Sequence, residues 1–414
     1  MKLAISIFRR LSGKTLSLPS ALFSVGFTFL GLCFFGQRVS LAASAQQGLW
    51  VPHTFGIAEF QGAAILKSGF PRPLIDASAN GITIDAIAFD YRNNAWLSLC
   101  DRGGVISTSA VVALTPEQLY DLSRRKSVSP AVVLDNSVYE SLLCPQALQF
   151  DARGELWVQT LGMDGLPNVS EFTPEQLHTG SPLAALTISS PVFAYPADIV
   201  FDRAGNLWVS DERATTPSRF VWGGIFEFSK DQLSNGGSMT PILTILPTDS
   251  ANAPRLTLQS PSGLAFDSSG SLWVAYGYGY DETNAGGVVM YSPDQLNAIG
   301  TTAPAPAITL ARNNASDPRN YNIYTPTSLA FDKAGDLWVA NEAPDTINEF
   351  PPDQLIGGTP PIPAIRLFSN PPTQQRPIIN FFHPNLIAFG PVVEKPRADS
   401  RAHRSLLHAH GRAG

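Results

Sequence analysis

Short apolar runs separated by turn-forming residues recur along most of this 414-residue chain. In five places an apolar run ends in Phe-Asp, and a Trp follows six residues after the Asp, at Asp90, Asp151, Asp202, Asp267 and Asp332. The intervals between successive runs are 61, 51, 65 and 65 residues. Periods of this length, built from short runs without helical periodicity, predict the blades of a β-propeller.

Each copy of the repeat contains the strands and turns of one blade. The first strand ends in Asp-x-x-Gly, in which the Asp caps a tight turn and the Gly supplies a positive φ. In the first copy Asn93 replaces the Gly, and Asn is the next best residue for this conformation. A second strand of the type Leu-Trp-Val follows, and we expect its Trp to pack between blades. The third strand ends in an aromatic residue, at Phe172, Phe228, Tyr291 and Phe350.

A short polar phrase follows the third strand of each copy. Its usual form is Ser or Thr, then Pro, an acid, Gln and Leu, and it begins at Thr115, Thr173, Ser229, Ser292 and Pro351. Ser or Thr as N-cap, Pro at the first helical position and Gln reaching back form a capping box, which predicts a single helical turn. The acids of this phrase therefore fit a capping role better than a catalytic one.

The two ends of the repeat region supply complementary parts of one more blade. Residues 48–51 and 56–60 match the second and third strands of the repeat, and residues 384–389 match the first. We therefore predict an all-β fold, a six-bladed β-propeller with four-stranded antiparallel blades. One C-terminal strand joins three N-terminal strands and closes the ring.

The phrase Phe-Asp-x-x-Gly-x-Leu-Trp-Val, followed by Asp or Asn, resembles the NHL repeat and the SMP-30 (gluconolactonase-like) propellers. The resemblance covers residues 48–390 and implies the same fold. It leaves the function open, because such propellers include lactonases, lyases, scaffolds and ligand binders.

The resemblance also implies where a metal would bind. SMP-30-like lactonases hold one divalent metal at the channel mouth through residues that follow the Pro opening each first strand. The equivalent positions here are Asp85, Gln146, Ala197, Ser262, Thr327 and Asn385. The ligands implied for a divalent cation such as Ca²⁺ are Asp85 and Asn385, with the neighbouring Asp198.

The N-terminal segment is typical of a secretory signal peptide, with basic residues, an apolar run over 21–36 and small residues before a cleavage site expected after Ala45. The apolar run is barely long enough to span a bilayer, so an uncleaved anchor is the weaker interpretation. We expect 1–45 to be a signal peptide, 46–393 the propeller and 394–414 a disordered basic tail. The protein would then be a bacterial periplasmic or secreted one, without a stable membrane span after signal removal.

The propeller body is acidic. The chain has a formal net charge of −6, but both ends are basic, and the body alone carries about −14. Charge of this sign repels nucleic-acid phosphates and anionic lipid, so we expect neither as a partner.

The long connections after the second and fourth strands are expected on one face, around the channel mouth, where variable loops commonly carry function. Their aromatic and acidic residues can stack a sugar or hold a cation. Two alternatives stay open: the loops form small cores of their own, or Asp211 and Asn341 tie each loop to the next strand, as the resemblance to NHL-type repeats implies. The candidate ligand-binding residues are His53, Asp211, Glu212, Trp222, Tyr276, Tyr278, Asn341 and His383.

Two cysteines remain after the signal segment, Cys100 and Cys144. Strand direction brings both to the same face of adjacent blades, and export makes a disulfide chemically feasible. Geometry decides between a disulfide and two small buried hydrophobic residues.

Three functions fit these features. We favour a binding module for a small molecule, a sugar or an envelope protein. The alternative is an SMP-30-like metal-dependent lactonase, hydrolase or lyase, and a third is a purely structural propeller. The sequence contains no Gly-x-Ser-x-Gly elbow, phosphate-binding loop, His-Glu-x-x-His or dinucleotide fingerprint.

Overall fold

The computed structural model describes most of the predicted propeller. The described ranges are 47–54, 56–78, 83–100, 109–135, 142–161, 166–180, 183–213, 223–246, 258–277, 286–298, 305–313, 320–343, 345–369, 381 and 383–395. The predicted signal peptide and the predicted tail beyond residue 395 lie outside the described residues. Within these ranges no helix is both long and apolar enough to cross a membrane.

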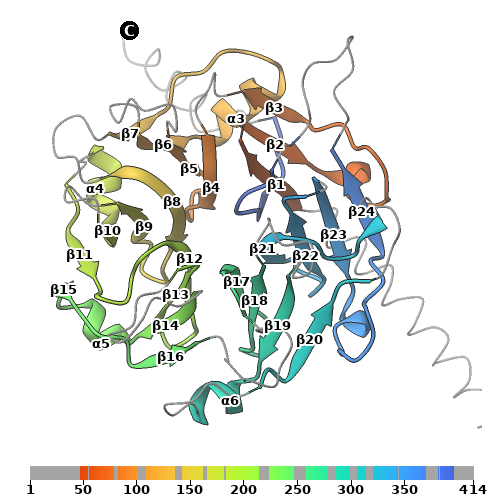
Figure 1. Cartoon of the computed structure of the whole chain (residues 1–414). Helices are drawn as coiled ribbons and strands as arrows, with labels where there is room; N and C mark the ends of the chain where they lie inside the picture. The colour runs from red at the N-terminus through yellow and green to blue at the C-terminus, as the bar shows by residue number, and fades with distance from the viewer. Residues whose placement is uncertain are drawn as a thin grey trace, which may run out of the picture.

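In the described part of the chain the strands form six sheets arranged in a ring, one sheet to a blade (Figure 1). Blade 1 contains β25 (Ala388–Pro391), β1 (Gln47–His53), β2 (Gly56–Phe60) and β3 (Ile75–Ser78). Blade 2 contains β4 (Thr83–Phe89), β5 (Ala95–Cys100), β6 (Ala110–Leu114) and β7 (Val132–Asp135). Blade 3 contains β8 (Leu143–Phe150), β9 (Leu156–Leu161), β10 (Pro167–Phe172) and β11 (Leu186–Ser189), with β15 (Gly237–Ser238) added in parallel to β11.

The other three blades follow the same order. Blade 4 contains β12 (Pro196–Phe201), β13 (Leu207–Asp211), β14 (Gly224–Phe228) and β16 (Leu243–Ile245). Blade 5 contains β17 (Pro261–Phe266), β18 (Leu272–Tyr276), β19 (Gly287–Tyr291) and β20 (Ile308–Ala311). Blade 6 contains β21 (Pro326–Phe331), β22 (Leu337–Asn341), β23 (Thr346–Phe350) and β24 (Ile365–Phe368). The predicted fold class, a six-bladed propeller, is confirmed.

The two ends of the repeat region close the ring as the sequence predicts. β25 pairs antiparallel with β1, with Leu49 opposite Phe389 and Gly48 opposite Gly390. This pairing satisfies the backbone groups on the inner edge of β1, which would otherwise expose an unpaired strand edge.

Six Trp–Phe contacts join the described blades in a ring. The Trp of each second strand is at most 3% exposed and packs against the Phe that ends the first strand of the next blade. The ring centroids are 5.4 to 6.2 Å apart, in tilted or edge-to-face arrangements that aromatic pairs favour. The pairs are Trp50–Phe89, Trp96–Phe150, Trp157–Phe201, Trp208–Phe266, Trp273–Phe331 and Trp338–Phe389.

The repeated Asp fixes both the turn and the Trp. In blade 5, for example, Asp267 Oδ1 accepts the backbone N–H groups of Ser269 and Ser271, and its Oδ2 accepts the indole N–H of Trp273 at 2.9 Å. The same indole bond is present in blades 2, 3, 4 and 6, at 2.9 to 3.5 Å with blade 5 included. One carboxylate therefore sets the turn geometry and the orientation of the ring that packs on the next blade.

The predicted capping boxes are present. In α3 (Pro116–Ser123), α4 (Pro174–Thr179) and α5 (Lys230–Leu233) the N-cap hydroxyl accepts the N–H of the Gln, and the Gln side chain accepts the N–H of the N-cap residue. The same two bonds hold Ser292 and Gln295 at the start of α6 (Pro293–Ala298). The α3 helix has eight residues and is therefore longer than the predicted single turn. Two 3-10 turns complete the described helices, η1 (Gly62–Ala64) and η4 (Pro352–Gln354).

Blade 1 differs from the others because its first and second strands come from opposite ends of the chain. Gly390 stands where the other blades have Asp, and a Cβ there would lie 2.3 Å from the ring of Phe89. Within the described residues, Trp50 Nε1 is buried without a hydrogen-bond partner. Both carboxylate oxygens of Glu59, which is fully buried, have none either. Burial raises the pKa of Glu59 to about 8.

Glu59→Gln should flatten the pH dependence of stability. The folded protein holds the Glu59 proton more tightly than the unfolded chain does, so its stabilising contribution is complete below about pH 4.5 and is lost as the pH rises toward about 8. Between pH 5 and pH 8, the free energy of unfolding of the wild type should fall by on the order of 3 kcal/mol more than that of the variant. Guanidinium unfolding at several pH values measures this difference. Glu117→Gln, at an exposed position of α3, is the control, and equal slopes for wild type and Glu59→Gln would contradict the account.

Candidate functional site

A cavity of about 500 Å³ lies at the mouth of the channel, on the face where the first strands begin. Residues from every blade line it. Each of the six positions that follow the opening of a first strand contributes a side chain: Asp85, Gln146, Ala197, Ser262, Thr327 and Asn385. The cavity is within the size range of small-molecule sites.

Asp85 and Asn385 lie together on one wall of this cavity. Asn385 Nδ2 donates to Asp85 Oδ1 at 3.1 Å and to the carbonyl oxygen of Ile84 at 3.0 Å. The Asp85 carbonyl oxygen in turn accepts the N–H of Leu386. These bonds tie the C-terminal segment that precedes β25 to blade 2, and they hold a buried carboxylate at the cavity wall.

His383 and Glu342 form a second polar pair in the lining. His383 Nδ1 lies 3.2 Å from Glu342 Oε1, and both side chains are roughly half exposed. Asp345 Oδ1 accepts the backbone N–H of His383 at 2.8 Å and so holds the segment that carries the imidazole. An imidazole paired with a carboxylate in an accessible cavity is a common arrangement in general acid–base catalysis.

Blade 4 contributes a third group to the lining, made of Tyr195, Glu212 and Arg213. The Arg213 guanidinium lies over the Tyr195 ring, 5.7 Å from its centroid. The N–H of Glu212 donates to the Tyr195 carbonyl oxygen. With Asp85 and Glu342, the described lining holds three carboxylates against one guanidinium and one imidazole.

Two predicted ligand-binding residues instead hold loops in place. Asp211 is fully buried, and its carboxylate accepts the N–H groups of Ala194, Tyr195 and Arg213. Asn341 Oδ1 accepts the N–H of Tyr324, and its Nδ2 donates to Thr346 Oγ1. Both residues position the lining through backbone bonds, as the structural alternative for the sequence pattern proposed.

The remaining candidates are buried, line the cavity or lie outside the described residues. His53 is 2% exposed, and burial lowers its pKa to about 4, so its imidazole is neutral at pH 7. Tyr276 is 8% exposed and packs within the core between blades 4 and 5. Glu212 and His383 do line the cavity. Trp222 and Tyr278 lie outside the described residues.

The predicted metal ligands are only partly brought together. Asp85 and Asn385 are in contact, but Asp198 is engaged elsewhere: its Oδ1 accepts the N–H of Ile199 and its Oδ2 that of Leu264, each at 2.8 Å. A calcium ion requires six to eight oxygen ligands. Of the six positions in the ring, one carries a carboxylate, so these residues do not fit a calcium site by themselves.

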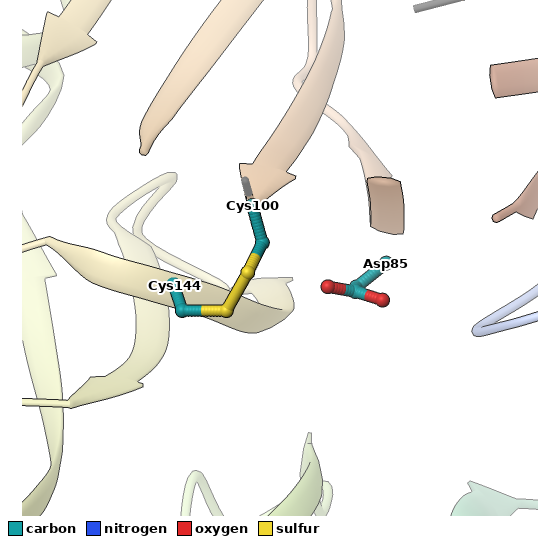
Figure 2. A group of neighbouring side chains, drawn as sticks. All are labelled: Asp85, Cys100 and Cys144. Carbon is teal, nitrogen blue, oxygen red and sulfur yellow. A yellow bond between two sulfur atoms is a disulfide. The ribbon is translucent and has the colours of Figure 1, made fainter. Parts of the chain in front are cut away.

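Cys100, at the end of β5, and Cys144, in β8, form a disulfide with their Cα atoms 4.5 Å apart. Figure 2 shows the Asp85 carboxylate beside it. The bond joins blade 2 to blade 3 at the cavity. Because both sulfur atoms are used in the disulfide, they are not thiolate ligands for a metal beside Asp85.

Sequence reasoning missed Glu342 and Arg213. A signal for Glu342 was available: Glu follows the residue that ends the second strand in both blade 4 and blade 6, at Glu212 and Glu342. Arg213 had no equivalent in the repeat, and its place over Tyr195 depends on the loop that Asp211 holds.

A smaller cavity of about 310 Å³ lies on the opposite face. Side chains of blades 2 and 3 alone line it in the described chain, including Trp96, Phe150 and Leu177. At the channel mouth, in contrast, polar groups from all six blades line one cavity.

No family model and no curated protein matches the chain. Solved structures do match. A protein of unknown function from Bacteroides caccae shares 13% identity over 83% of this chain and 99% of its own, with a TM-score of 0.45. A putative gluconolactonase shares 17% identity over 69% and 80% of the two chains, with a TM-score of 0.40.

Regucalcin from Agrobacterium tumefaciens, described as a calcium-binding protein, shares 15% identity over 72% of this chain and 79% of its own, with a TM-score of 0.34. The six-bladed fold that the predicted resemblance implied is present in the sheets of this chain itself. Identities this low say nothing of ligand or reaction, which depend on the residues of the site.

Replacing both cysteines by Ser should lower the free energy of unfolding by about 4 kcal/mol, because the disulfide closes a 44-residue separation and restricts the unfolded chain. Guanidinium unfolding of the oxidised wild type and of the double variant measures the loss. A reductant should destabilise the wild type and leave the variant unchanged. Equal stability of the two proteins without reductant would contradict this assignment.

Proposed function

We propose that this chain is an exported binding protein that takes a small polyhydroxylated or cationic molecule at the channel mouth. The observation that carries the proposal is the convergence of side chains from all six blades on one cavity of about 500 Å³. A cavity with a few oriented polar groups is the usual form of a small-molecule site.

The chemistry of the lining supports this ligand class. Three carboxylates, Asp85, Glu212 and Glu342, accept hydrogen bonds from hydroxyl or ammonium groups. The Ser262 and Thr327 side chains donate to carbonyl oxygens of the neighbouring blade, Pro326 O and Pro384 O, and so are fixed in place. A lining held by bonds between blades is preorganised, which reduces the ordering cost of binding.

Two features support export. The first is the predicted signal peptide over residues 1–45. The second is the Cys100–Cys144 disulfide, since disulfides persist in oxidising compartments such as the periplasm or the extracellular space.

The His383–Glu342 pair favours a second candidate, a hydrolase or lyase. The pair is accessible within the cavity and has the composition of a general acid–base group. In such an enzyme His383 would accept or donate the proton, and Glu342 would orient the imidazole and stabilise its charged form.

Ala197→Trp tests the binding site by filling the cavity without removing a polar group. The panel consists of monosaccharides, their lactones and aliphatic polyamines, and calorimetry measures affinity. For the compound that binds the wild type most tightly, the variant should bind about tenfold or more weakly, a loss of roughly 1.4 kcal/mol. Ala152→Trp, at an exposed turn on the opposite face, should bind like the wild type. Unchanged affinity in Ala197→Trp would rule out the mouth as the site.

His383→Ala separates the two candidate functions. The binding protein should bind its ligand without turnover, so the substitution changes affinity alone. If the wild type hydrolyses or eliminates any panel compound, His383→Ala should lower kcat by about 100-fold and remove one limb of the pH–rate profile. Turnover by the wild type that this substitution abolishes would replace the binding proposal with the enzyme.

A further inference from the structure

Three buried carboxylates meet on the face opposite the channel mouth, in blade 6. Asp332 directly follows β21, Asp336 precedes β22, and Glu349 lies on β23 directly opposite Trp338. They are 6%, 3% and 7% exposed. One oxygen from each lies within 4.8 Å of the others.

The turn and the tryptophan account for part of this cluster. Asp332 Oδ1 accepts the N–H groups of Ala334 and Asp336, and Oδ2 accepts the indole N–H of Trp338 at a long 3.4 Å. Glu349 Oε2 is buried in the cluster and has no hydrogen-bond partner in the described part of the chain. A carboxylate oxygen this deeply buried costs free energy unless something satisfies it.

Blade 3 shows what satisfies the same arrangement elsewhere in the ring. Asp151, Glu155 and Glu171 occupy the three equivalent positions, and the Arg153 guanidinium makes ion pairs with all of them, including Asp151 at 3.2 Å and Glu171 at 3.7 Å. The residue at the place of Arg153 in blade 6 is Ala334.

In blade 4 an amide side chain, not a guanidinium, satisfies the acidic residues. There Asn206 replaces the middle acid, and its Nδ2 donates to both Asp202 and Glu227. Blade 6 therefore retains all three acids of blade 3 without the arginine that bridges them.

We propose that Asp332, Asp336 and Glu349 bind a divalent cation, with Ca²⁺ the best fit, in the position that the Arg153 guanidinium takes in blade 3. Carboxylate oxygens are the ligands that Ca²⁺ prefers, at about 2.3 to 2.6 Å. Two oxygens on opposite sides of such an ion are about 4.6 to 5.2 Å apart, and the three carboxylates each offer an oxygen within 4.8 Å of the others, close enough to share one ion. Mg²⁺ is usually held through one or two carboxylates and keeps several waters, so a set of three carboxylates favours Ca²⁺. The ion would brace the turn between β21 and β22, and water would complete its shell.

Calcium should stabilise the full chain after metals are removed with a chelator. At a calcium concentration of about 100 times Kd, Tm should rise by roughly 5 °C. Terbium, which takes calcium sites, should show emission sensitised by indole excitation, because Trp338 borders the cluster, and excess calcium should quench that emission.

Ala334→Arg is the decisive variant, because it supplies the guanidinium that blade 3 contains. It should raise Tm without calcium and abolish both the calcium shift and the terbium emission. Glu349→Gln should also remove both, and Glu227→Gln, at the same strand position in blade 4, should retain them. Asp85→Asn should retain them as well, since it alters the channel mouth alone. No calcium shift in the wild type, a full shift in Ala334→Arg or Glu349→Gln, or loss of the shift in Asp85→Asn would overturn the proposal.

Discussion

The contact between one tryptophan and the phenylalanine of the next blade is the interaction on which this propeller depends. Each blade presents its Trp on the second strand, and the repeated Asp fixes the indole by a hydrogen bond while it caps the turn. Six such contacts in the described chain, all close to 6 Å between centroids, set the spacing of the blades. Because this framework uses only the end of the first strand, the first turn and the second strand, the loops on the other face are free to differ in length and composition. Residues of those loops and of the starts of the first strands line the cavity at the channel mouth.

The closing blade is the place where this framework is incomplete. Glycines at 48 and 390 replace the polar residues that would partner Trp50 and Glu59, and the buried carboxylate of Glu59 is left to take up a proton. On the opposite face, at the channel mouth, two further bonds join neighbouring blades. Asn385 bonds blade 1 to Asp85 of blade 2, and the disulfide bonds blade 2 to blade 3. The same cross-links hold one wall of the candidate ligand site, so ring closure and site geometry share residues.

The sequence predicted the fold almost completely and the site only in outline. The fold was readable because the strands, the Asp turn and the capping box are local patterns repeated in every blade, and because the missing strands at the two ends were complementary. The six positions around the mouth came from the resemblance to SMP-30-like propellers. The His383–Glu342 pair and the Arg213–Tyr195 contact did not, since each depends on loop paths that no repeat specifies. Asp198 and Asp211 looked like ligands in sequence, yet backbone N–H groups occupy their oxygens. The sequence shows that blade 6 has Ala where blade 3 has the Arg beside its three acids. It does not show that Glu349 is buried, which only the structure reveals.

The channel mouth is the proposed ligand site of this protein. The most direct measurement is a crystal structure of the full propeller with the tightest-binding compound of the screen. Electron density for that compound is expected in the mouth cavity, within hydrogen-bonding distance of Asp85, Arg213 or His383. Density on the opposite face or on the outer edge of a blade, with the mouth holding only water, would contradict it.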